Sequence, residues 1–156
     1  MIRRVPPPAV LLSAPDDVEA QFYEALLQAD IERLMAVWAD DDEIVCIHPG
    51  GARMIGAAAI RASFEAVFAS GGLRLRPEQQ HRLQQPGFAM HHLVERIDVD
   101  TDQGPQSAWV LATNVYVKTA LGWRLAAHHA SPGMAPEVAA PAGAAVGGSE
   151  RPSTLH

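Results

Sequence analysis

The second half of the chain alternates between apolar and polar residues in four successive stretches. The stretches cover residues 73–83, 88–99, 108–118 and 123–130. A period of two is typical of strands that bury one face. Turn sequences rich in glycine or proline separate the stretches, at residues 85–87, 102–105 and 121–122. We therefore predict four consecutive antiparallel strands joined by hairpins.

The first half of the chain carries helical periodicity instead. A stripe formed by Val18, Phe22, Ala25, Leu26 and Ala29 follows Asp16-Asp17, two acids that suit the positive end of a helix. Further stripes follow Asp30, a predicted N-cap, and Gly56, and they comprise Ile31, Leu34, Met35 and Trp38, then Ile60, Phe64, Val67 and Phe68.

Between the second and third helices, residues 44–47 form a short β-branched run before Pro49-Gly50-Gly51, which indicates another strand. Helices followed by a meander predict an α+β fold, with the helices packed on one face of the sheet.

Composition suggests three segments. Residues 1–14 are predicted to be a flexible arm, residues 15–132 the folded domain, and residues 133–156 a disordered tail rich in alanine, proline and glycine. The start of the chain faintly resembles a signal peptide, but its apolar part is short and broken by prolines 6–8. Because no run approaches the length of a membrane span, we expect a cytoplasmic protein without membrane contact.

Charge and composition exclude several classes of function. The 18 acidic residues outnumber the 12 basic ones, which gives a net charge of -6. The basic residues are dispersed and form no stripe of the kind that binds nucleic acid. Gly50-Gly51 is not followed by the lysine of a phosphate-binding loop. The single cysteine, Cys46, lies in an apolar run, so we interpret it as a buried hydrophobic residue; a nucleophile is the alternative.

Several short motifs resemble one superfamily. The stretches 22–26, 29–30, 38–41 and 48–51 (FYEAL, AD, WADD and HPGG) are similar to the nuclear transport factor 2-like superfamily. The stretches 112–115, 122–125 and 128–132 (ATNV, GWRL and HHASP) are similar to its SnoaL-like, ketosteroid-isomerase-like branch.

This resemblance covers most of residues 16–132 and implies a specific architecture. We expect a curved antiparallel sheet wrapped by three N-terminal helices into a cone of the cystatin-like type. It also implies a small-molecule pocket inside the cone and a homodimer formed through the outer face of the sheet. The superfamily contains enzymes and non-catalytic domains, so the resemblance does not determine the function.

The same resemblance makes His48 a candidate general base. In ketosteroid-isomerase-like enzymes an aspartate stands just before a proline at this point, and here His48 precedes Pro49. Imidazole can transfer protons near neutral pH, although a structural hydrogen bond is an equal alternative. The tyrosine that donates to the oxyanion in those isomerases corresponds to Phe22, and Tyr23 is expected to point about 100° away around the helix. Steroid isomerisation is therefore not predicted.

Two histidine pairs add candidates. Adjacent strand residues face opposite sides, so at most one of His91/His92 and one of His128/His129 can face the pocket. Resemblance to the association domain of the calmodulin-dependent kinase implies that its pocket arginines correspond to Asn114 and Ala130. Asn114 and His128 would then point inward, and with His48 they form the predicted catalytic set.

The remaining predicted pocket residues are Trp38, Phe22, Arg53 and the histidines His91, His92 and His129. Three converging imidazoles would have the composition of a zinc site, but their spacing matches no compact metal motif. We therefore expect no metal and no cofactor.

Two hypotheses for function stay open at this stage. In one, the domain binds a small, largely apolar ligand in a His-lined pocket without catalysis. In the other, it is a small isomerase, cyclase or hydro-lyase in which His48 is the base and Asn114 or His128 polarises a carbonyl group.

Overall fold

The computed structural model describes residues 12–136 and contains three helices and six strands in that range. The helices are α1 (Pro15–Gln28), α2 (Ile31–Ala36) and α3 (Ala57–Phe68). The strands are β1 (Val45–Ile47), β2 (Arg53–Ile55), β3 (Leu75–Gln85), β4 (Phe88–Thr101), β5 (Gly104–Thr119) and β6 (Gly122–Pro132). Most of the predicted arm and tail, residues 1–11 and 137–156, lies outside the described residues.

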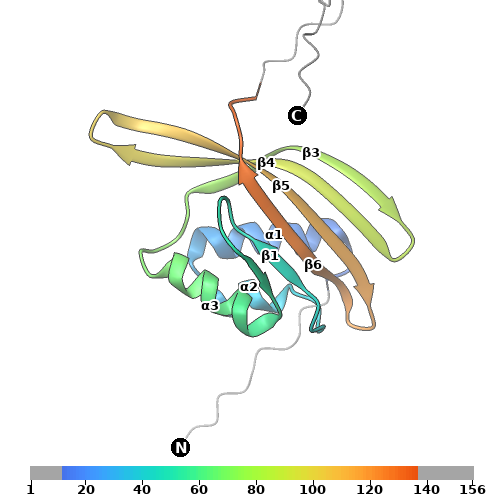
Figure 1. The fold of residues 1–156 in the computed structure, drawn as a ribbon. Helices are drawn as coiled ribbons and strands as arrows, with labels where there is room; N and C mark the ends of the chain where they lie inside the picture. Colours follow the sequence, from blue (N-terminus) through green and yellow to red (C-terminus); the bar gives the residue numbers. More distant parts are fainter. Residues whose placement is uncertain (1–11, 137–156) are drawn as a thin grey trace, which may run out of the picture.

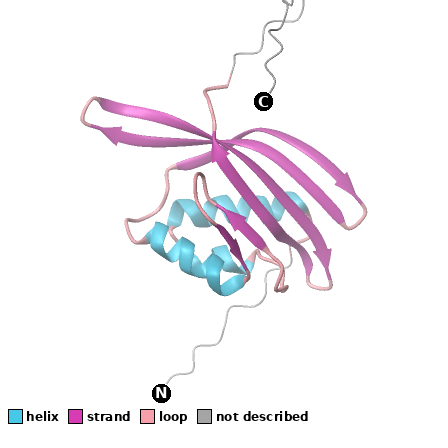
Figure 2. Cartoon of the chain, viewed as in Figure 1, coloured by secondary structure: helices cyan, strands magenta, loops and turns pink. Residues whose placement is uncertain are grey.

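The six strands form one curved, open sheet in the order β2-β1-β6-β5-β4-β3. Strands β3 to β6 form the predicted meander, and the three helices lie together on one side of it (Figures 1 and 2). The α+β class predicted from the sequence is confirmed. Among the named strands only β1 pairs in parallel, with β6, and this pairing sets Cys46 beside His128. His48 is the residue that directly follows β1, so the β1–β6 pairing determines where it lies.

Strand β6 also organises the segments that lead into and out of the helices. Trp38 forms a parallel bridge with Leu125, and Leu12 forms one with Gly122. Leu12 is buried, although the sequence analysis assigned it to the arm. Leu12 supplies a backbone partner, to Trp123 N–H at 2.8 Å, and an apolar side chain to the β5–β6 hairpin.

The core forms between the helices and the inner face of the sheet. Phe22 is at its centre, and its ring makes edge contacts with the rings of Tyr23, Trp38 and Phe64 at centroid distances of 5.1, 6.5 and 6.1 Å. Such edge-to-face contacts are the favoured arrangement of aromatic rings. The predicted N-cap is also confirmed, because the Asp30 carboxylate accepts a bond from the backbone N–H of Arg33 at 3.1 Å.

Cys46 is fully buried in this core. Burial, reinforced by the charge of Glu95, raises the pKa of its thiol to about 12. A thiol in that state is a poor nucleophile, which supports its interpretation as a small core residue. Among the described residues, no helix is long and apolar enough to cross a membrane. The cytoplasmic location stays a prediction.

Candidate functional site

Four polar side chains from four elements meet in the interior between α1 and the sheet. Tyr23 comes from α1, Glu95 from β4, Asn114 from β5 and His128 from β6, and all four are buried. The Tyr23 hydroxyl donates to Glu95 Oε2 at 2.8 Å and accepts from Asn114 Nδ2 at 3.0 Å. Asn114 Oδ1 lies 2.6 Å from His128 Nδ1. We call these four residues the interior cluster.

Strand pairing explains why the interior cluster forms. Asn114 is directly opposite His91 on β4 and His128 on β6, so the three side chains project from the same face of the sheet. Glu95 is four residues beyond His91 on β4, and an even spacing keeps it on that face. A register shift between Val115 and Tyr116 changes the β5–β6 pairing just beyond Asn114.

The hydrogen bonds assign a tautomer to His128. Asn114 Oδ1 can only accept, because its amide nitrogen is used toward Tyr23, so His128 carries its proton on Nδ1. The second ring nitrogen, Nε2, lies 4.0 Å from Glu95 Oε2. The cluster is therefore a chain of bonds that starts at Glu95 and returns close to it.

Burial drives the ionisable members of the cluster toward their neutral forms. Loss of water contact raises the pKa of Glu95 to about 7, although the bond from Tyr23 acts in the opposite direction. Burial lowers the pKa of His128 to about 3, and nearby His48 and His129 add to this effect. Burial also raises the pKa of Tyr23 well above its ordinary value. Near neutral pH, Glu95 is the member that can change its charge.

His48 is adjacent to the cluster but is bonded elsewhere. Its Nε2 lies 3.0 Å from Ser63 Oγ, whose single hydrogen is donated to the carbonyl of Ile60 at 2.7 Å. His48 must therefore donate from Nε2, which leaves Nδ1 as its basic atom. Its ring packs on Phe64 at 4.8 Å, and partial burial lowers its pKa.

A second buried polar pair lies further along α1 and β4. Glu19 Oε2 is 2.9 Å from His91 Nδ1 and accepts a bond from Gln80 Nε2 at 2.9 Å. The cleft beside this pair, between α1 and β3, has a volume of ≈ 360 Å³. Tyr23 also lines that cleft, so it reaches the edge of the interior cluster.

The structure brings together only part of the predicted pocket. His91 and His128 are the inward members of the two histidine pairs, as alternation allows, whereas His92 and His129 are exposed on the outer face. Arg53 is exposed on β2. His92 and His129 lie outside the interior because adjacent strand residues face opposite sides of the sheet. Arg53 lies outside it because β2 is at the edge of the sheet.

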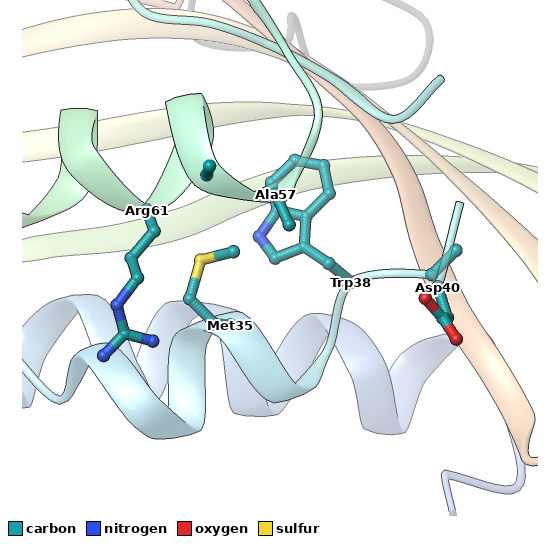
Figure 3. A pocket seen from close by; sticks show the side chains of 7 residues that line it. Met35, Trp38, Asp40, Ala57 and Arg61 are labelled. Carbon is teal, nitrogen blue, oxygen red and sulfur yellow. The ribbon is translucent and has the colours of Figure 1, made fainter. Parts of the chain in front are cut away.

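Trp38 is buried beside Phe22, but its indole faces a different cleft. That cleft has a volume of ≈ 390 Å³ and lies between α2 and α3 (Figure 3). In Figure 3 the indole nitrogen is directed to the side where Met35 and Arg61 lie. Among the described residues, the nitrogen has no hydrogen-bond partner. Phe22 packs against the His128 ring at 5.0 Å and is the predicted pocket residue nearest the cluster.

Sequence reasoning missed Tyr23, Glu95 and Glu19. Tyr23, expected to point about 100° away from Phe22 around the helix, is buried as well, because α1 packs against both the sheet and α2. A signal for Glu95 was present, since His91, Leu93 and Glu95 occupy alternate positions of one strand. A charged residue at the third of these positions indicates a buried carboxyl group.

Comparison with known proteins identifies the family and the fold. A family model described as a SnoaL-like domain matches residues 16–135. A Thiobacillus denitrificans protein, named provisionally as a calcium/calmodulin-dependent protein kinase type II association domain, is 36% identical with a TM-score of 0.73. The match covers 80% of this chain and 99% of that one. None of the curated proteins compared with the chain matches it.

Two further solved structures support the same fold. A Streptomyces avermitilis protein, named provisionally as a dehydratase of the NTF2-like family, is 27% identical with a TM-score of 0.67, covering 76% of this chain and 93% of that one. An uncharacterised Caulobacter vibrioides protein with a cystatin-like fold is 14% identical with a TM-score of 0.66, covering 76% and 87%. The predicted cystatin-like fold is confirmed.

Removing the Tyr23 hydroxyl should destabilise the protein more than removing the Tyr116 hydroxyl. Tyr23→Phe leaves Glu95 Oε2 and Asn114 Nδ2 without the hydroxyl that each now bonds, which costs about 1–3 kcal/mol. Tyr116 is equally buried but its hydroxyl has no partner among the described residues, so Tyr116→Phe should be neutral or stabilising. Urea unfolding of both variants measures the difference, and equal losses would contradict the bonding described for Tyr23.

The opposite pKa shifts of Glu95 and His128 should produce opposite pH dependences of stability. Between about pH 4.5 and 7, Glu95 keeps its proton in the folded state but loses it in the unfolded chain. The contribution of Glu95 to the free energy of unfolding therefore falls as pH rises through that window. Between about pH 6.5 and 3, His128 takes up a proton in the unfolded chain but stays neutral in the folded state. The contribution of His128 to the free energy of unfolding therefore falls as pH drops through that range.

Single substitutions separate the two contributions. Relative to Glu95→Gln, the wild type should lose roughly 3 kcal/mol of unfolding free energy between pH 4.5 and 7, on the order of 1.4 kcal/mol per pKa unit. Relative to His128→Gln, the wild type should instead gain stability as pH rises from about 3 to 6.5. Urea unfolding across this pH range checks both slopes; difference curves that stay level would refute the shifts.

Proposed function

This chain belongs to the SnoaL-like domain family, and we propose that it binds a small, largely apolar molecule inside the cone, at the interior cluster and His48. The ligand would carry one polar group, a carbonyl or hydroxyl, to exchange hydrogen bonds with the cluster. Phe22 and Phe64, which pack against His128 and His48, would contact its apolar part. Sites of this kind combine apolar walls with a few convergent polar groups.

The buried, ionisable interior cluster is the observation that carries this proposal. Burying a carboxyl group, an imidazole and a phenol costs free energy that well-packed apolar residues would not cost. A group such as Glu95, with a pKa raised to about 7 by burial, is typical of functional sites. The cleft lined by Tyr23 and Glu19 offers a route from solvent toward the cluster.

The alternative function is catalysis of isomerisation, cyclisation or loss of water. His48 would be the general base through Nδ1, while Asn114 and His128 would polarise a carbonyl group. Glu95 favours this alternative, since an acid with a pKa of about 7 can also transfer a proton at neutral pH. The provisional name of the Streptomyces avermitilis relative, a dehydratase, is in line with such chemistry.

A thermal-shift screen of cyclic ketones against the corresponding hydrocarbons tests ligand binding. A ligand that binds the folded state raises the melting temperature by mass action. His48→Ala should abolish the shift caused by a ketone, and His129→Ala, which removes an exposed imidazole on the outer face, should preserve it. If both variants respond as the wild type does, His48 is no part of the site.

The same ketone can separate binding from catalysis. In D₂O, an isomerase-type base exchanges the protons next to the carbonyl group for deuterium, which proton NMR follows directly. A non-catalytic binder raises the melting temperature without exchange. Exchange that persists in the His48→Ala variant but is lost in Glu95→Gln would assign the base to Glu95 instead.

We also propose a homodimer formed through the outer sheet face. Apolar side chains are exposed there, including Leu83 on β3 and Leu111 on β5, with Val94 directly opposite Leu111. The Thiobacillus denitrificans relative is named as an association domain, which supports self-association. Apolar surface on a sheet is removed from water when two copies pack face to face.

A charge placed on this face should dissociate the dimer. Leu111→Asp puts a carboxylate into the proposed interface, whereas Leu27→Asp puts one on the exposed side of α1. Light scattering coupled to size-exclusion chromatography should report a monomer for the first variant and a dimer for the second. A monomeric wild type would exclude the proposal, and so would a dimeric Leu111→Asp variant.

A further inference from the structure

Asp16, Glu19 and His91 form a compact group of potential metal ligands outside the interior cluster. Asp16 and Glu19 are three residues apart in the first turns of α1, so they lie on one side of the helix. His91 faces them from β4. One ligand atom from each residue lies within 4.8 Å of the others, a separation that a single cation can span.

Glu19 supplies a second observation. The residue is only 2% exposed, and its Oε1 has no hydrogen-bond partner among the described residues. A buried carboxylate oxygen without a partner is costly, and a bound cation would remove that cost.

Besides His91, two side chains of β3 contact these carboxylates. Arg82 Nε donates to Asp16 at 3.0 Å, but its side chain is 46% exposed. Gln80 donates its amide nitrogen to Glu19, and rotation of that amide would present its oxygen as a further ligand. The two carboxylates and Arg82 leave one net negative charge, and the chain carries -6 in total.

We propose that Asp16, Glu19 and His91 bind one divalent cation of the Mn²⁺ type, independently of the proposed ligand at the interior cluster. Two carboxylates and one imidazole supply oxygen and nitrogen donors, a set that suits Mn²⁺ or Fe²⁺. Thiolate ligands, which zinc sites often contain, are not part of this group. The cleft lined by Asp16, Glu19 and Gln80, of ≈ 360 Å³, gives the cation access and provides space for water ligands.

Titration of the ¹⁵N-labelled full chain with Mn²⁺, followed by NMR, tests the site. The protein must carry no histidine tag, because a tag would bind the metal itself. Paramagnetic broadening should begin at the amides of Glu19, Gln80 and His91 and saturate at one equivalent. Broadening that begins instead around His129, an exposed histidine of the outer face on β6, would overturn the proposal.

Matched variants address the ligands one by one. Asp16→Asn should weaken Mn²⁺ binding by at least about tenfold, whereas Asp17→Asn, one position along the helix and outside the group, should leave it unchanged. Arg82→Gln should tighten binding, because it removes the competing cation from Asp16. Calorimetry gives the affinities.

Glu19→Gln provides the check at the buried position. It should abolish saturable binding, and its NMR spectrum without metal shows whether the fold is intact. If that variant is unfolded, the exposed Asp16→Asn and Arg82→Gln variants decide. Equal Mn²⁺ affinities of the wild type and Asp16→Asn, or no binding by the wild type, would refute the site.

Discussion

The hydrogen bond from Tyr23 to Glu95 is the contact on which the interior depends. It joins the middle of α1 to β4 at 2.8 Å, and together with the Glu19–His91 contact it adds directional links to a core built mainly from apolar side chains. Apolar contacts tolerate small rotations of a helix, whereas a buried hydrogen bond does not, because each group would lose its partner. This bond therefore fixes which face of α1 meets the sheet, and with it the positions of Phe22 and Glu19.

A second consequence is electrostatic. Glu95 Oε2 and His128 Nε2 are 4.0 Å apart, close enough for an ion pair. Burial nevertheless raises the pKa of Glu95 and lowers the pKa of His128, so it favours the neutral form of each. The cost of taking two charges out of water exceeds what their attraction returns at that separation. A neutral cluster can accept a neutral ligand without first breaking an ion pair, and Glu95 can still lose its proton when a ligand changes its surroundings.

Much of the fold could be predicted from periodicity, because strands and helices bury faces of fixed period. The meander and the stripes through Phe22 and Phe64 follow from that rule. Strand alternation also limited each histidine pair to one inward member, but it did not say which one. The position of Tyr23 could not be predicted this way. One exposed helix buries a single stripe, but α1 packs against both the sheet and α2 and therefore buries a wider arc.

The relation between the two buried pairs depends on tertiary geometry in the same way. Glu19 and Tyr23 are four residues apart on α1, and their partners His91 and Glu95 are four residues apart on β4. Four residues advance a helix by about 6 Å and a strand by about 13 Å. The long glutamate and tyrosine side chains bridge this difference, so both pairs form only when α1 crosses β4 at one angle and one height. The proposed cation site and the proposed ligand site are consequently held by the same crossing, and a change at Glu19 that shifts α1 would also be felt at Tyr23.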